Sequence, residues 1–288
     1  MRPLLASVSA VLICFLMLSS LVILEHSNSI SDDLEATGSE PIQFTSARAS
    51  SASFISSGGS STQSIDSAHI VADPFDGWII GSEYNTTLTF GTNTLQPTSP
   101  YGGTYGEFFL ATIDSAGTWQ SVFGADHSYG AGGLSFLTDV SVDDFGDIII
   151  TGYYYGEISF SGGMGNPPSV LSNTNSGYFF EGFIAKADSM GNWLWANGFV
   201  TQVNGSGEYS LAKGVQADMA GDVFITGEFE GETDFGGSIL NVSSTQVFIA
   251  KYSGIDGALE WVIDGGGIGT NAVFDLAVTP TGGIKLAT

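Results

Sequence analysis

Cysteine and basic side chains are nearly absent from this sequence. Its 288 residues contain one cysteine, Cys14, which lies in an apolar N-terminal run, so the remainder of the chain has no disulfide. Lys and Arg together number 6 against 30 Asp and Glu, which gives a formal net charge of −24. Such a charge repels nucleic acids and anionic membranes and attracts cations. The composition therefore excludes a disulfide-stabilised domain and a nucleic-acid partner.

Proline is scarce as well, at 8 residues, whereas glycine is abundant, at 40. This balance favours tight turns between short strands. The length allows one or two domains with a substantial buried core. We therefore expect an all-β chain with many hairpins.

Sequence motifs that identify an enzyme or a metal centre are missing too. The chain contains no G-x-S-x-G, no H-E-x-x-H and no phosphate-binding glycine loop. His69 and His127 have no second His or Cys at metal-ligand spacing, which argues against zinc. We predict no catalytic, cofactor-binding or metal-binding residue.

An uncharged, mostly apolar run extends over Leu4–Leu24. Its length just suffices to span a bilayer as a helix, and it exceeds the apolar region of most cleaved signals. We predict a signal peptide or a membrane-anchor helix over 1–26, both alternatives remaining open, and a Ser/Thr-rich acidic stalk over 27–49. The protein is then extracellular or at the cell surface, secreted or anchored, and contacts a membrane only through this N-terminal segment.

The rest of the chain contains an internal repeat of roughly 60–75 residues. Three segments share the frame of an acidic turn that ends in glycine and leads into a strand: 142–152 (VDDFGDIIITG), 217–227 (ADMAGDVFITG) and 278–288 (VTPTGGIKLAT). A degenerate copy with a shortened turn lies at 72–81. A second block recurs as FLATID at 109–114, FIAKAD at 183–188 and FIAKYS at 248–253, each followed by a glycine turn and a Trp. Between the two blocks, Phe90, Phe160 and Phe235 also correspond.

Each repeat resolves into four short strands, which in the best copy lie near 138–143, 147–155, 180–188 and 192–199. Four antiparallel strands per repeat are typical of a β-propeller blade. We predict a β-propeller-type array over residues 50–288, with blades at about 66–124, 138–199 and 212–265 and a partial blade at 274–288.

The predicted count of about three and a half blades is short of the 4–8 that usually close a ring. Residues 52–59 read as the fourth strand of a blade whose other three strands are missing. We therefore expect an incomplete ring and a chain that is a fragment of a longer propeller.

The pattern D-x-x-G-D, then I-T-G, F-I-A-K and G-x-x-x-W, resembles the bacterial and archaeal SBBP β-propeller repeat family over residues 50–288. The resemblance implies a propeller fold. It implies little about activity, because such repeats occur in many exported proteins of unknown role.

The acidic turns, such as Asp143-Asp144-x-x-Asp147, make calcium the one cofactor to consider. They match no EF-hand loop, and an Asx hydrogen bond with a left-handed glycine is a sufficient structural cause. Lys186 and Lys251 recur at one repeat position, and we predict that they pair with nearby carboxylates.

Candidate N-glycosylation sequons begin at Asn85, Asn204 and Asn241, in predicted loops. The preferred function is a non-enzymatic binding module for an extracellular protein or glycan, with recognition on the long connections between the second and third strands. Alternatives are a polysaccharide hydrolase or lyase with a channel-face site, and a structural component of the cell envelope.

Overall fold

The protein is described by a computed structural model. It places residues 8–16, 20–28, 55–59, 68–75, 77–98, 106–127, 133–161, 169–173, 179–202, 207–266, 273, 275–279 and 283–287. Every regular element in these ranges is a strand, and every strand pairing is antiparallel, so the all-β class is confirmed. None of the sheets formed by the described strands closes into a barrel.

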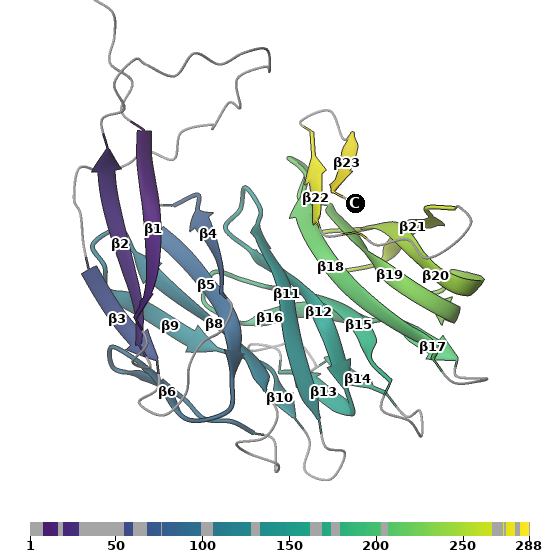
Figure 1. Cartoon of the computed structure of the whole chain (residues 1–288), viewed down its shortest axis with the longest axis horizontal. Coiled ribbons are helices and arrows are strands. Elements are labelled where there is room, and N and C mark those ends of the chain that lie inside the picture. The colour runs from purple at the N-terminus through teal and green to yellow at the C-terminus, as the bar shows by residue number, and fades with distance from the viewer. Residues whose placement is uncertain are drawn as a thin grey trace, which may run out of the picture.

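Three four-stranded meanders follow one another along the chain (Figure 1). Sheet I contains β4 (His69–Asp73), β5 (Gly77–Tyr84), β8 (Glu107–Asp114) and β9 (Trp119–Phe123). Sheet II contains β11 (Leu134–Val142), β12 (Ile148–Tyr155), β15 (Glu181–Ala187) and β16 (Trp193–Gly198). Sheet III contains β18 (Tyr209–Ala217), β19 (Val223–Asp234), β20 (Ile239–Tyr252) and β21 (Leu259–Asp264). Hairpin IV consists of β22 (Asp275–Val278) and β23 (Ile284–Ala287).

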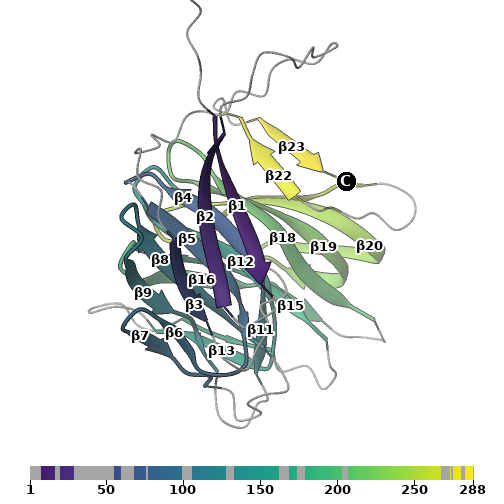
Figure 2. The ribbon, with the colours of Figure 1, turned by 60° about the vertical axis from the view of Figure 1, so that its left-hand side comes forward.

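The three sheets and hairpin IV are arranged side by side, with their first strands adjacent. Strand β11 contacts β4 on one side and β18 on the other, and β18 contacts β22. Figure 1 shows sheet I at the left, sheet II in the middle and sheet III at the right. Figure 2 shows hairpin IV next to β18. Equivalent positions of successive sheets therefore face one another across each boundary.

Small sheets join neighbouring units at the end where the second and third strands connect. Strand β10 (Asp126–His127), which follows sheet I, pairs with the hairpin of β13 (Glu157–Phe160) and β14 (Ser169–Ser172) that belongs to sheet II. In the same way β17 (Val200–Gln202), which follows sheet II, pairs with the far end of β19 in sheet III. The connections are thus used to hold successive sheets together.

Strand β3 (Ile55–Gly59) takes the corresponding place before sheet I. It pairs with β6 (Leu88–Phe90), which forms a hairpin with β7 (Asn93–Leu95), and on its other side with β2 (Ser20–Asn28). The sequence predicted a fourth blade strand over 52–59. The described part, β3, instead pairs with β6 in the connection of sheet I, as β10 and β17 pair with the connections of sheets II and III.

The apolar N-terminal run contains two strands, β1 (Val8–Leu16) and β2, paired as an antiparallel hairpin. The predicted helix over 1–26 is therefore not confirmed. An unbroken run of apolar residues has no periodicity that separates strand from helix. Within the described residues, no helix is long and apolar enough to cross a bilayer. The predicted stalk over 27–49 lies outside the described residues, except for its first two, which end β2.

Aromatic side chains fill the space between the sheets. The equivalent residues Phe90, Phe160 and Phe235 are fully buried. The ring centroid of Phe160 lies 4.8 Å from that of Trp193 and 5.6 Å from that of Phe183, between sheets I and II. Complete burial of each such ring stabilises the fold by roughly 2–3 kcal/mol. The spacing of these landmarks in the sequence therefore reflects the core.

Candidate functional site

The glycine turns of the repeat share one hydrogen-bonding scheme. Asp143 Oδ1 accepts the backbone N–H groups of Phe145 and Asp147, each at 2.9 Å, and Gly146 has a φ of +84°. The same scheme is formed around Asp114, Asp188 and Asp218. Since one oxygen of each carboxylate holds its own turn, the predicted structural role is confirmed for Asp143 and Asp218 and is shared by Asp114 and Asp188. Among the described residues no three His, Cys, Asp or Glu side chains are placed to share a metal ion.

Both recurring lysines pair with carboxylates, as predicted. Lys186 is buried, with its Nζ 2.8 Å from Asp143 Oδ2 and 3.1 Å from Asp147 Oδ2. It also donates to the carbonyl of Gly254 in sheet III, at 3.0 Å, and so links two sheets. Nζ of the equivalent residue, Lys251, lies 2.6 Å from Asp222 Oδ2. These ammonium groups are therefore bound within the protein, and the predicted pairing accounts for both lysines.

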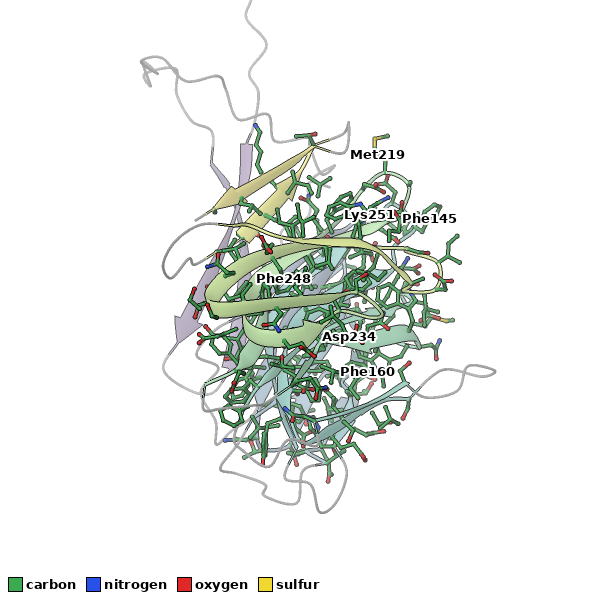
Figure 3. The ribbon with its side chains drawn as sticks, turned by 90° about the vertical axis from the view of Figure 1, so that its right-hand side faces the viewer. Phe145, Phe160, Met219, Asp234, Phe248 and Lys251 are labelled. Atoms are coloured by element: carbon green, nitrogen blue, oxygen red, sulfur yellow. The ribbon has the colours of Figure 1, made fainter. Side chains whose placement is uncertain are left out.

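Large apolar side chains protrude from the tips of these turns. The turns between first and second strands and between third and fourth strands lie at one end of the sheets, which we call the turn face. Its exposed apolar residues are Phe75 (67% exposed), Phe145 (65%), Met190 (75%), Met219 (70%) and Ile255 (92%). Figure 3 shows Phe145 and Met219 near one edge of the molecule with Lys251 close by. Exposed apolar groups gathered at one end are typical of an interaction surface.

Adjacent turns of the turn face fit into each other. A Cβ on Gly146 would lie 2.7 Å from Phe75 Cε2, and a Cβ on Gly221 would lie 3.3 Å from Phe145 Cε2. The ring of one unit therefore rests on the turn glycine of the next. This contact fixes one edge of each ring while most of its surface stays exposed.

The turn face is strongly acidic. Its carboxylates are Asp73, Asp114, Asp143, Asp144, Asp147, Asp188, Asp218, Asp222, Asp256 and Glu260. Its two described lysines, Lys186 and Lys251, are already paired with some of these groups. Hydrogen bonds from Ser253 and the N–H of Ala258 lower the pKa of Asp256, which stays ionised. An approaching ligand therefore meets apolar tips surrounded by negative charge.

A second group of residues has the outline of a catalytic triad. His127 Nε2 lies 3.1 Å from Ser135 Oγ, and His127 Nδ1 lies 3.5 Å from Glu107 Oε2. These residues lie within a span of 29 residues, at 107, 127 and 135, and no motif indicated that they would meet. All three are buried: Ser135 is 0% exposed, Glu107 1% and His127 4%.

The same positions in the next sheet show what this group does. Ser135 Oγ accepts the N–H of Phe108 across the boundary between sheets I and II. Ser210, the equivalent residue, accepts the N–H of Gly182 across the boundary between sheets II and III. Thr201 replaces His127 there. A nucleophile must reach substrate, and a fully buried serine that recurs as a link between sheets is structural.

A third group lies on the adjacent first strands. His69 Nδ1 is 3.9 Å from Asp139 Oδ1, and both side chains are about one quarter exposed, 29% and 26%. Burial raises the pKa of Asp139 to about 6 and lowers that of His69. Asp139 accepts the N–H groups of Val140 and Val215 at 2.8 and 2.9 Å, so its carboxylate also ties β11 to β18.

The candidate glycosylation sites have different surroundings. Asn85 is half-buried in the bend after β5. Asn241 is exposed but lies inside strand β20, with its Nδ2 3.2 Å from Glu232 Oε2, rather than in the predicted loop. Asn204 lies outside the described residues. Glycosylation stays a prediction at all three.

Comparison with known protein families found no match, and comparison with curated proteins found none either.

The sequence did not lead us to expect the turn face, although it contains a signal for it. A large apolar residue at the tip of an Asp-x-x-Gly turn cannot be needed for the turn itself.

Proposed function

We propose that residues 50–288 form β-propeller-type units of an exported protein that acts as a non-enzymatic interaction module. Three successive four-stranded antiparallel meanders with adjacent first strands support the propeller arrangement. The resemblance to the SBBP repeat family belongs to the same proposal. The observation that carries the function is the turn face, with five large apolar side chains held at turn tips.

The binding surface of this proposal differs from the one expected from sequence. Described parts of the second-to-third connections of sheets II and III pair with β10 and β17, the strands that follow the preceding sheet, and their landmark phenylalanines are buried. Exposed apolar residues at that end, such as Val170 (51%), Val200 (44%) and Ile239 (60%), are β-branched and lie on strands. The turn face offers two Phe and two Met side chains as well as Ile255, at the tips of hydrogen-bonded turns, which suits recognition.

Export is proposed from the apolar run over Leu4–Leu24 and the acidic, Ser/Thr-rich segment that follows it. A strongly acidic surface with few lysines suits a protein that stays soluble outside the cell.

A second candidate is a polysaccharide hydrolase or lyase, favoured by the His69–Asp139 pair on the first strands. The raised pKa of Asp139 is typical of a general acid. Against it, both carboxylate oxygens already accept backbone N–H groups, Oδ1 from Val140 in the same strand and Oδ2 from Val215 in β18. The interaction module accounts for more of the exposed chemistry.

Site-specific photocrosslinking of the full chain in its native cells tests the proposal. A photoreactive residue replaces Phe145 on the turn face or, as a control, Val170 at the opposite end. We expect a defined adduct from position 145 and none from position 170. Equal adducts at both positions, or turnover of a polysaccharide that Asp139→Asn abolishes, would contradict the interaction module.

A further inference from the structure

We infer that the turn face binds a cationic amphipathic protein segment, in which Lys or Arg alternates with large apolar side chains. This inference rests on the proposed function and names the class of partner. It is carried by the arrangement of apolar and acidic groups at the turn tips.

Each apolar tip has a carboxylate as a close chain neighbour. Asp144 precedes Phe145, Asp218 precedes Met219, and the pairs Asp73 with Phe75, Asp188 with Met190 and Ile255 with Asp256 complete the set of five. A ligand that buries one of these tips therefore brings its own flanking groups to a negative charge. Basic groups next to apolar ones satisfy both requirements, because each ion pair forms at the edge of a dehydrated contact.

Two of the apolar tips are already held in position before a ligand binds. Phe75 rests against Gly146 and Phe145 against Gly221, so binding restricts little additional side-chain motion. Met190 and Met219 add unbranched, polarizable side chains that adapt to ligands of different shape. A row of aromatic and methionine residues is the composition found at the centres of protein interfaces.

Charge also argues against other occupants. A second copy of this chain would bring a like-charged acidic face against the first, and an anionic membrane or a nucleic acid would be repelled. A neutral lipid surface would accept the apolar tips but would leave the surrounding negative charge uncompensated. A basic protein segment complements both features.

The test uses the full chain and synthetic peptides of defined composition. The probe is a peptide of alternating lysine and leucine, compared with one of alternating lysine and serine that has the same charge, and binding is followed by fluorescence anisotropy. The variant Phe145→Ser/Met219→Ser is compared with Val170→Ser/Ile239→Ser, which removes exposed apolar groups at the opposite end with no change in charge. Met190→Ser/Ile255→Ser provides a second turn-face variant, and thermal unfolding checks that each variant is folded.

We expect the lysine–leucine peptide to lose about tenfold or more in affinity on both turn-face variants and less than about twofold on the control. Equal binding of both peptides, or equal losses in all variants, would show only diffuse charge attraction and would overturn the inference. Preferential binding to phosphatidylcholine vesicles, or self-association that the turn-face variants abolish, would overturn it in favour of a lipid surface or a second copy.

Failure of this inference can be distinguished from failure of the proposed function. A specific crosslink at position 145 to a partner without basic groups would leave the interaction module standing and remove only this class of partner.

Discussion

Individual polar residues in the core are matched from one unit to the next. Tyr154 donates to Glu181 at 2.9 Å inside sheet II, and Tyr84 donates to Glu107 at 3.2 Å inside sheet I. In sheet III the pairing register places Phe229 and Gln246 at the corresponding positions, both buried. The third unit therefore shows that an uncharged pair fits the same site. A buried carboxylate is a cost that the fold does not require.

Stability should fall as pH rises because of this carboxylate. Burial raises the pKa of Glu181 to about 7, so the folded state holds its proton at a higher pH than the unfolded state does. The stabilising contribution is complete below the unfolded pKa and is lost as pH rises through about 7. Tyr154→Phe/Glu181→Gln, which copies sheet III, should flatten the fall in unfolding free energy between pH 5 and pH 8 by roughly 2–3 kcal/mol. Urea unfolding across this range measures it.

The control for that prediction is Glu260→Gln, an exposed carboxylate already paired with Lys251. It removes one exposed carboxylate and keeps the Tyr154–Glu181 pair, so a difference in slope between the two variants belongs to the buried pair. If the unfolding free energy of Tyr154→Phe/Glu181→Gln fell with pH as steeply as that of the original chain, Glu181 would titrate normally in the folded state.

At the scale of elements, the hairpin turns also act between units. The left-handed φ of Gly146 closes the turn between β11 and β12, and the missing Cβ leaves room for the ring of Phe75 from sheet I. The conformational and the packing requirement thus fall on one residue. Gly237 also has a positive φ, +104°, but its added Cβ would meet no atom within 4 Å.

These two glycines separate backbone strain from packing. Gly237→Ala should cost about 1 kcal/mol through its backbone conformation alone, whereas Gly146→Ala should cost roughly 2–3 kcal/mol because it also displaces Phe75. In a Phe75→Ala background the excess at Gly146 should disappear, as a double-mutant cycle by denaturant unfolding would show. The same cost for Gly146→Ala in both backgrounds would mean that the ring does not press on the turn.

At the scale of the whole molecule, the net charge of −24 opposes folding through self-repulsion. Only six basic side chains are present, and the described ones on the turn face are already paired with carboxylates. The surface repulsion is long-range and is screened by salt, whereas the buried Lys186 contacts are screened much less.

Raising NaCl from about 0.02 M to about 0.5 M should therefore increase the melting temperature by several degrees, because the Debye length falls below the distance between surface charges. KCl at equal concentration should have the same effect. Calorimetry with CaCl2 at matched ionic strength provides the contrast. A rise in melting temperature that is specific to calcium at submillimolar concentration would contradict simple screening and would indicate a cation site in the acidic turns.

The sequence by itself determined the features that depend on neighbouring residues. Asp-x-x-Gly turns, β-branched strands and recurring phenylalanines set the hairpins, because turn chemistry and a two-residue alternation act locally. The pairing of Lys186 and Lys251 with carboxylates also followed, since the acidic turn and the lysine recur together in each repeat. The all-β class with antiparallel sheets could be predicted on that basis.

Only the tertiary structure decided how the units join. The pairing of β10 and β17 with the next sheet, the meeting of Glu107, His127 and Ser135, and the seating of Phe75 on Gly146 link residues from different repeats. Such contacts depend on how whole sheets stack, and no local pattern in the sequence records their geometry. The acidic, apolar turn face exists for the same reason: its members are scattered along the chain and become one surface only when the sheets lie side by side.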